Sequence, residues 1–146
     1  MIAVALDKAR AVARRWSGPA VVLGADTEVV LDGALLGKPA DAADAMRMLR
    51  ALRGRSHEVI TGVALVESPA GREETAAVAT RVTMAEATDE EIAAYVATGE
   101  PLDKTGAYAV QGLGGRLVSS VDGCYTNVVG LPVETTRRLL QRFGLL

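Results

Sequence analysis

Two long β-rich runs joined by a short turn limit what this chain can fold into. Residues 56–68 read "SHEVITGVALVES" and residues 72–87 read "REETAAVATRVTMAEA", with Pro69 and Gly71 between them. β-Branched residues recur in both runs, and a connection this short joins antiparallel neighbours. The sequence therefore predicts a β-hairpin in the middle of the chain and argues against a purely parallel sheet.

Helical and extended patterns alternate around this hairpin. The start of the chain carries apolar side chains at helical spacing, which predicts an amphipathic helix ended by Gly18 and Pro19. The apolar positions of this helix are Ile2, Leu6, Ala9, Ala13 and Trp16. "AVVLGADTEVVLDG", residues 20–33, then predicts a strand with a turn at Asp32 and Gly33 that leads into "ALLGKP".

The remaining elements follow from capping and spacing signals. A helix is expected over residues 41–52, with Gly54 just beyond its end. Its inward positions are Ala45, Met48, Leu49 and Leu52. Thr88 with Glu91 three residues later is typical of a capping box, so a short helix should follow and close at Gly99.

The C-terminal part predicts three more segments. "GRLVSSVDG" is strand-like, "CYTNVVG" is expected to be short and extended, and "PVETTRRLLQRFG" predicts a helix that begins at a proline. The whole order predicts the α/β class: a single domain over residues 1–146 with a mixed, twisted sheet and flanking helices.

The amino-acid composition limits the kinds of partner that we expect this protein to bind. The 146 residues carry a net charge of -2 and include one tryptophan, three tyrosines and one phenylalanine, so neither a basic field nor a stacking surface for nucleic acid is expected. A small anionic ligand held by a few local cations is compatible with this net charge. Cys124 is the single cysteine, and the sequence contains neither a secretory h-region nor a membrane-length apolar run. We therefore expect a cytoplasmic protein that binds neither nucleic acid nor membranes.

Several common chemistries are excluded. One histidine and one cysteine cannot build a structural zinc site, and no serine lies in a G-x-S-x-G motif. "GLGG" at residues 112–115 is expected to precede a strand rather than to open a helix, which weakens a dinucleotide-loop interpretation. A structural or supporting role is favoured for His57, and packing rather than nucleophilic attack is favoured for Cys124.

Carboxylates and lysines in special local settings remain as candidates. Asp26 and Glu28 should project to one face of an extended segment, where two carboxylates could hold Mg²⁺. A pair of solvated strand residues explains the same pattern equally well. Lys38 lies in "GKP", which either aims one cation at a ligand or forms an ordinary surface turn.

The stretch "GEPLDKTGAYAVQG", residues 99–112, is longer and more specialised than a plain connection. Lys104 and Gln111 belong to it, and its glycines would let backbone N–H groups approach a ligand. Together with the paired carboxylates, a lysine and an amide suggest a nucleotide, whose phosphates and base both need partners.

Four separated blocks resemble the Maf family of nucleoside triphosphate pyrophosphatases. They are "GADTEVVLDG", "LGKPADAADAMRMLRALRGRSHEVITGV", "TDEEIAAYVATGEPLDKTGAYAVQGLGG" and "GCYTNVVGLPVE", in the family order. The resemblance implies a fold similar to that of inosine triphosphate pyrophosphatases. It also implies hydrolysis of a nucleoside triphosphate to the monophosphate and pyrophosphate with a divalent metal, Mg or Mn, for which Asp26 and Glu28 are the candidate ligands.

The resemblance also implies residue roles. Asp26 matches the family's proton acceptor, while Lys8 and Lys38 match lysines that stabilise phosphate charge. Thr27 and Gln111 match positions used for base selection. "DKTGAYAVQG", with Lys104, is similar to the branch that acts on dTTP and UTP, whereas the 7-methyl-GTP branch carries a different residue for Lys104 and a glutamate for Gln111.

One departure from the family keeps alternatives open. Family members begin with a short strand and a Ser-x-Ser-Pro-Arg-Arg loop, and nothing like that loop occurs in this sequence. The chain is thus expected to be truncated at its N-terminus relative to the family. A weak or inactive nucleotide-binding module or fragment, with a regulatory role in cell division, is the alternative to an active enzyme. An open sheet edge would favour a homodimer.

Overall fold

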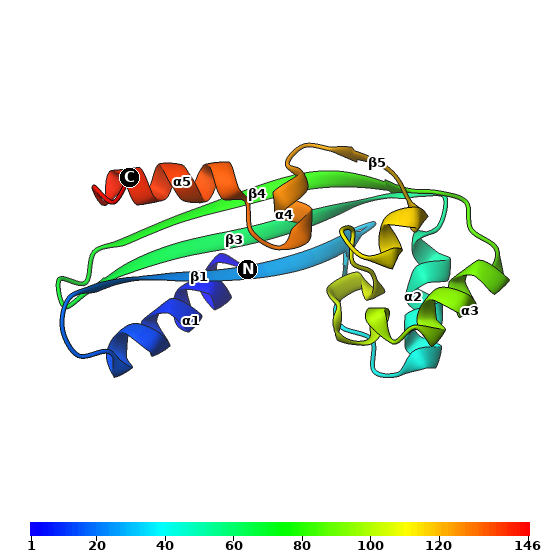
Figure 1. Ribbon diagram of the computed structural model, residues 1–146, viewed down its shortest axis with the longest axis horizontal. Helices are drawn as coiled ribbons and strands as arrows, with labels where there is room; N and C mark the ends of the chain where they lie inside the picture. The colour runs from blue at the N-terminus through cyan, green and yellow to red at the C-terminus, as the bar shows by residue number, and fades with distance from the viewer. The chain divides into compact units, whose positions relative to one another are not determined.

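A five-stranded sheet with helices packed on it organises the chain (Figure 1). The computed structural model describes residues 1–146, and the strand order in the sheet is β2-β1-β3-β4-β5. The strands are β1 (Ala20–Leu31), β2 (Ala34–Leu36), β3 (Ser56–Ser68), β4 (Glu73–Met84) and β5 (Val118–Asp122). The α-helices are α1 (Ile2–Arg15), α2 (Ala42–Leu52), α3 (Asp89–Ala97), α4 (Tyr125–Val129) and α5 (Val133–Arg142). Three short 3₁₀ helices are η1 (Glu100–Asp103), η2 (Thr105–Ala107) and η3 (Leu113–Leu117).

Tight turns set the antiparallel pairing. Asp32 and Gly33 both have positive φ, 50° and 79°, which suits a two-residue hairpin between β1 and β2 with Leu31 opposite Ala34. The predicted hairpin of β3 and β4 is confirmed, and Glu67 N–H donates to the Arg72 carbonyl at 2.8 Å across its turn. Strand β5 pairs antiparallel with β4. The α/β class with helices flanking a sheet is confirmed.

The chain divides into two compact units. The first unit comprises Met1–Thr27, Ile60–Ala79 and Thr126–Leu146, and the second comprises Glu28–Val59 and Thr80–Tyr125. Strands β1, β3 and β4 contribute residues to both units. No helix is both long and apolar enough to span a membrane.

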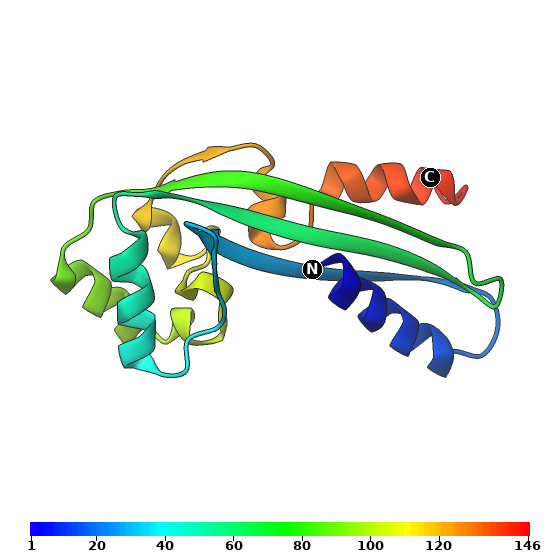
Figure 2. The ribbon, with the colours of Figure 1, turned by 180° about the vertical axis from the view of Figure 1, so that it is seen from behind.

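In the first unit, α1 and α5 cover opposite faces of the strands (Figures 1 and 2). Ala9 and Ala13 of α1 pack on Val66, with Val22 beside them. Leu139 of α5 packs instead on Leu65, the neighbour of Val66, together with other apolar residues that include members of β1, β3 and β4. Because successive side chains of a strand point to opposite faces, this adjacent pair on β3 shows that the sheet is covered on both sides.

Close approach of α1 to β1 depends on Gly24. A Cβ atom built on Gly24 would lie 2.2 Å from the Ala5 carbonyl oxygen and 3.1 Å from the Ala9 backbone nitrogen. Ala5 and Ala9 are themselves fully buried. The small side chains of α1 and the missing side chain of Gly24 therefore set the distance between helix and strand.

In the second unit, α2 and α3 pack together with η1 and η2. The predicted inward face of α2 is confirmed, since Ala45, Met48, Leu49 and Leu52 are all buried. Asp41 caps α2 by accepting from the Asp44 N–H at 2.8 Å. Thr88 caps α3 by accepting from the Glu91 N–H at 3.1 Å, as its capping-box signature predicts.

Three local predictions are wrong. Residues 125–129, expected to be extended, form α4, because Asn127 is buried there and its Nδ2 donates to the Val78 carbonyl at 2.9 Å. The residues before Val118 form η3 rather than the start of a strand, so "GLGG" does lead into a short helix. Trp16 lies beyond the end of α1 with 60% of its surface exposed, so it does not join the buried face.

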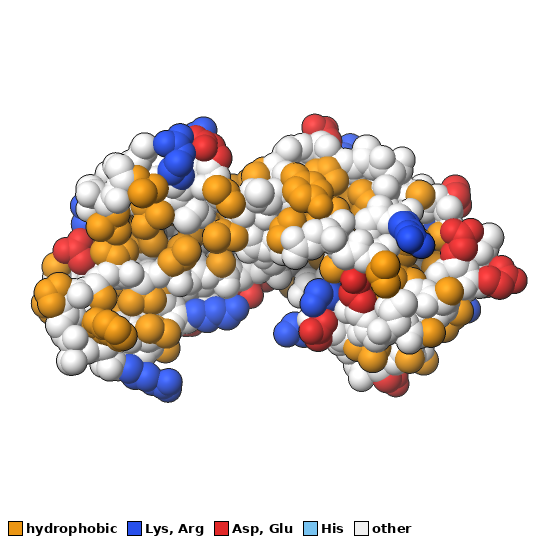
Figure 3. Space-filling view, viewed as in Figure 1, with side chains coloured by type: hydrophobic (Ala, Val, Ile, Leu, Met, Phe, Trp, Pro, Cys, Tyr) orange, Lys and Arg blue, Asp and Glu red, His pale blue; other side chains and the backbone are white.

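The outer side of α1 also carries apolar residues. Val4 and Val12, spaced by eight positions, are exposed on either side of Lys8. Figure 3 shows hydrophobic side chains on the surface over this helix. Nothing in the structure covers them.

Candidate active site

Lys8 and Asp26 come together in the first unit. Lys8 projects from α1, and its Nζ lies 3.5 Å from Asp26 Oδ1 and donates to the Ala25 carbonyl at 3.2 Å. The Lys8 side chain is 57% exposed, whereas that of Asp26 on β1 is 21% exposed. The lysine ammonium thus has donor capacity left for an external anion beside a half-buried carboxylate.

Thr27 points away from this pair. It follows Asp26 directly in an extended strand, so its side chain faces the other side of the sheet. The Thr27 hydroxyl shares a 2.9 Å hydrogen bond with the Thr61 hydroxyl, which donates to the Asn127 carbonyl at 3.2 Å. In this structure the Thr27 hydroxyl therefore serves internal packing between β1, β3 and α4.

Lys38 and Lys104 share an electrostatic environment in the second unit. The Gly106 N–H donates to the Gly37 carbonyl at 3.0 Å, which holds the "GKP" turn against the segment after Lys104. Lys104 Nζ donates to Asp103 Oδ1 at 2.9 Å. This hydrogen bond, the charge of Lys104 and the nearby charge of Lys38 hold the pKa of Asp103 below its usual value. The fold thus brings two of the candidate site lysines near one carboxylate.

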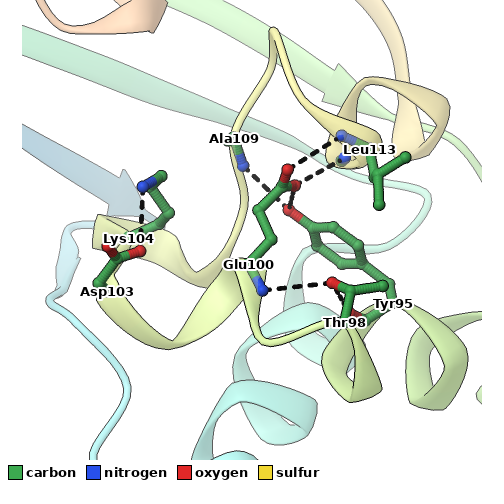
Figure 4. A network of polar contacts seen from close by, with 8 residues as sticks. Tyr95, Thr98, Glu100, Asp103, Lys104, Ala109 and Leu113 are labelled. Carbon is green, nitrogen blue, oxygen red and sulfur yellow. Dashed lines mark hydrogen bonds and ion pairs between the residues drawn. The ribbon is translucent and has the colours of Figure 1, made fainter.

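Glu100 organises the 99–114 segment, a role that sequence reasoning missed. Its carboxylate accepts the Tyr95 hydroxyl in a short hydrogen bond and the N–H groups of Leu113 and Gly114 at 3.1 and 3.0 Å (Figure 4). Burial raises the pKa of Glu100, but these hydrogen bonds outweigh it, so the pKa lies below its usual value. The available signal was a glutamate directly after Gly99, at the start of a glycine-rich stretch.

The glycines of this segment serve its own folding. A Cβ on Gly112 would lie 2.1 Å from Glu100 Oε1, and one on Gly114 would lie 2.5 Å from the Tyr95 hydroxyl. Gly106 has a φ of +74°, and its Cβ would lie 2.9 Å from Val29. We expected backbone N–H groups of this segment to approach a ligand. At Leu113 and Gly114 these N–H groups instead donate to the Glu100 carboxylate.

Gln111 is the exposed amide of the segment. Its side chain makes no hydrogen bond within the protein, although the backbone on both sides is fixed. It is therefore able to both donate to and accept from a ligand.

His57 is buried and hydrogen-bonded, which fits the structural or supporting role favoured for it. It is 3% exposed, and its Nε2 shares a 2.6 Å hydrogen bond with the Tyr108 hydroxyl. The two rings also meet edge to face at 5.5 Å. Burial lowers the pKa of His57 to about 4, and Nδ1 has no partner that could accept an added proton.

A pH-dependent loss of stability is expected from His57. A histidine that titrates near 6.5 when unfolded and near 4 when folded stabilises the fold fully above pH 6.5 and loses that contribution as the pH falls toward 4. The loss is on the order of 3 kcal/mol. Urea unfolding at pH 7 and pH 4 should show a larger drop for wild type than for His57→Gln. Equal drops in the two proteins would contradict this prediction.

The donor set fits a hard divalent cation. No cluster of three or more histidine, cysteine, aspartate or glutamate side chains is present. Mg²⁺, however, needs only one or two protein carboxylates, because waters and substrate phosphates complete its shell. Asp26 is half-buried with one oxygen near Lys8, and Glu28 lies two residues further along β1 and is partly buried.

The chain thus has an α/β sheet covered by helices, a lysine–aspartate pair in the first unit, and a glycine-rich segment with a lysine and an exposed amide in the second. Comparison with known sequences makes the class specific: a family model described as Maf-like protein matches residues 1–143. The chain belongs to the Maf family.

The curated relatives cover nearly all of this chain. A dTTP/UTP pyrophosphatase of Anaeromyxobacter dehalogenans is 56% identical over 146 residues, which are 99% of this chain and 73% of that protein. One of Moorella thermoacetica is 54% identical over 143 residues, 98% of this chain and 73% of the relative. One of Dictyoglomus turgidum is 50% identical over 140 residues, 96% of this chain and 72% of the relative.

Proposed function

We propose that this protein is a nucleoside triphosphate pyrophosphatase that hydrolyses dTTP and UTP to the nucleoside monophosphate and pyrophosphate. The observation that carries the proposal is the identity of 50–56% to three dTTP/UTP pyrophosphatases over almost the whole chain. A composition without a basic field supports a small nucleotide rather than a nucleic acid as the partner. Nucleoside triphosphates are cytoplasmic metabolites, so we propose the same compartment for the enzyme.

Asp26 acts as the proton acceptor in this proposal. A water oxygen attacks the α-phosphorus, the bond between the α-phosphorus and the bridging oxygen breaks, and pyrophosphate leaves. The proton of the attacking water passes to the Asp26 carboxylate, which is less exposed than its partner and is held near Lys8 Nζ.

Lys8 and Lys38 neutralise phosphate charge. Lys8 Nζ already lies against one carboxylate oxygen and one carbonyl oxygen, and its exposure allows a phosphate oxygen to approach. Lys38 is exposed at a turn held by the Gly37–Gly106 hydrogen bond, and Lys104 adds a second cation to that environment. Positioned cations stabilise the charge that spreads over phosphoryl oxygens during transfer.

Asp26 and Glu28 would hold the divalent metal, Mg²⁺ or Mn²⁺. When bound, such an ion would neutralise charge on the phosphates and on the departing pyrophosphate. The carboxylates would hold the ion on β1.

Gln111 selects the base, with Thr27 proposed to assist. Gln111 is exposed and has both a free donor and a free acceptor, as pairing with a pyrimidine edge requires. The Thr27 hydroxyl is hydrogen-bonded to the Thr61 hydroxyl. For Thr27 to assist in base selection, this hydrogen bond must rearrange or Thr27 must act through packing.

The proposal is tested by pyrophosphate release from dTTP, UTP, CTP, GTP and 7-methyl-GTP with Mg²⁺ or Mn²⁺. Turnover that favours dTTP and UTP is the expected result. Turnover of purine nucleotides alone, or none of any nucleotide, would contradict it.

Exchanging the amide of Gln111 for a carboxylate should change base preference. Gln111→Glu removes the amide donor and adds a charge, so kcat/KM for dTTP is expected to fall about tenfold or more relative to 7-methyl-GTP. Gln141→Glu, at an exposed position on α5, makes the same exchange away from the segment and should leave the ratio unchanged. An unchanged ratio in Gln111→Glu would remove Gln111 from base selection.

A further inference from the structure

Gln111 lies between two fixed points of the backbone. The Ala109 N–H, two residues before it, donates to the Tyr95 hydroxyl at 3.1 Å. The Leu113 N–H, two residues after it, donates to Glu100 Oε1 at 3.1 Å. Residues on both sides are thus tied to a common pair of side chains, while the Gln111 side chain itself stays exposed.

Tyr95 and Glu100 form a single clamp. The Tyr95 hydroxyl donates to Glu100 Oε2, and the same oxygen accepts from the Gly114 N–H at 3.0 Å. Figure 4 shows the side chains of Tyr95 and Glu100 in contact, with the backbone amides of Ala109 and Leu113 directed at them. Tyr95 is 6% exposed and belongs to α3, so the clamp rests on a packed helix rather than on the loop.

The clamp is also fixed from the α3 side. The Glu100 N–H donates to the Thr98 hydroxyl at 3.2 Å, and that hydroxyl donates to the Tyr95 carbonyl at 2.6 Å. Gly112 and Gly114 leave room for the carboxylate and the phenol, where any Cβ would collide with them. The backbone hydrogen bonds, the two glycines and the clamp side chains therefore all favour a single conformation of residues 109–114.

We propose that Glu100 is a positioning residue for nucleotide selection: through the Tyr95–Glu100 clamp it holds the backbone of Gln111 in the conformation that reads the base. This inference rests on the proposed function, since it concerns the substrate preference of the same enzyme. Glu100 touches no substrate atom in this role. A merely structural Glu100 would lower the amount of folded protein and so reduce turnover of every nucleotide by the same factor.

Two variants and one control separate these cases. Glu100→Gln replaces one acceptor oxygen by an N–H donor facing the backbone amides, and Tyr95→Phe removes only the hydroxyl that links Glu100 to Ala109. Glu90→Gln, on the exposed side of α3, removes the same charge without a hydrogen bond. The measured quantities are kcat and KM for dTTP and for GTP, and hydrogen exchange of the Leu113 and Gly114 amides.

Both clamp variants are expected to lower the dTTP-to-GTP ratio of kcat/KM by about tenfold, mainly through KM for dTTP. Amide exchange at Leu113 and Gly114 should become at least about tenfold faster in Glu100→Gln. Glu90→Gln should match wild type in both measurements. If Glu100→Gln folds poorly, Tyr95→Phe supplies the same comparison with the carboxylate intact.

The outcomes distinguish this inference from the proposed function. Faster amide exchange with an unchanged nucleotide ratio would overturn the positioning role while leaving the pyrophosphatase proposal intact. Unchanged exchange would overturn the clamp. A wild type without turnover would contradict the proposed function. In that case the ratio of the dissociation constants for dTTP and GTP, measured by calorimetry, is compared between variants in place of the kcat/KM ratio. A clamp variant with the wild-type ratio of constants, or a wild type that binds neither nucleotide, would overturn the inference as well.

Discussion

Replacing Asp26 by asparagine is expected to lower kcat for dTTP hydrolysis by a factor of about 10²–10⁴. The amide of Asp26→Asn cannot accept a proton from water, although it has nearly the same size. Its ion pair with Lys8 is largely open to solvent on the lysine side and contributes about 0–1 kcal/mol to stability. The variant should therefore fold as wild type does, with the loss confined to catalysis.

Asp7→Asn is the matched control for this experiment. Asp7 is exposed on α1 directly beside Lys8, so its replacement changes the net charge by the same amount in the same part of the chain. Pyrophosphate release should be close to the wild-type rate in Asp7→Asn. If Asp26→Asn keeps more than half of the wild-type kcat, Asp26 is not the proton acceptor.

The same assay separates the enzyme from the alternative of a nucleotide-binding module. An enzyme shows turnover that depends on Asp26. A binding module shows saturable binding of dTTP without turnover in either protein, and Asp26→Asn then changes affinity alone.

Adding one methyl group at Gly24 is expected to destabilise the protein by about 2–4 kcal/mol. At most strand positions, Gly→Ala is neutral or stabilising, because alanine loses less conformational entropy on folding. In Gly24→Ala the new Cβ would lie 2.2 Å from the Ala5 carbonyl oxygen, which belongs to the backbone of α1 and cannot rotate away. Helix α1 must therefore shift as a whole.

Thermal and urea unfolding measure this effect. For a chain of this size the melting temperature should fall by about 5–15 °C. Because α1 carries Lys8, kcat/KM per folded molecule should also fall. Gly37→Ala is the control, since a Cβ there meets nothing within 4 Å and the φ of Gly37 is not positive. A melting temperature of Gly24→Ala equal to that of Gly37→Ala would contradict the packing argument.

Elements with local signals could be predicted from the sequence. The apolar spacing of Ala45, Met48, Leu49 and Leu52 predicts the buried face of α2, and the Thr88–Glu91 box predicts the start of α3. Such signals lie within a few residues, because helix periodicity and capping are properties of a single turn or two. The β3–β4 hairpin belongs to the same group.

The candidate site was predictable in part. Asp26 and Lys8 follow from residue type and family resemblance, and their proximity in the first unit is what the fold adds. The clamp at Glu100 was not predictable, since a glutamate after a glycine is equally typical of an exposed turn. Its role depends on Tyr95, Leu113 and Gly114 reaching it at the same time.

Where the apolar pattern is periodic, the order of residues is enough to predict the helices and strands, and it also shows which residue types are available for phosphate chemistry. Tertiary structure decided the helical state of residues 125–129, where buried Asn127 bonds to Val78, and the engagement of Thr27 with Thr61. It also decided the use of Gly24 as a contact point for α1. These features depend on partners that are distant in sequence, and no periodicity encodes such a partner, because only the packed fold brings the two groups within reach.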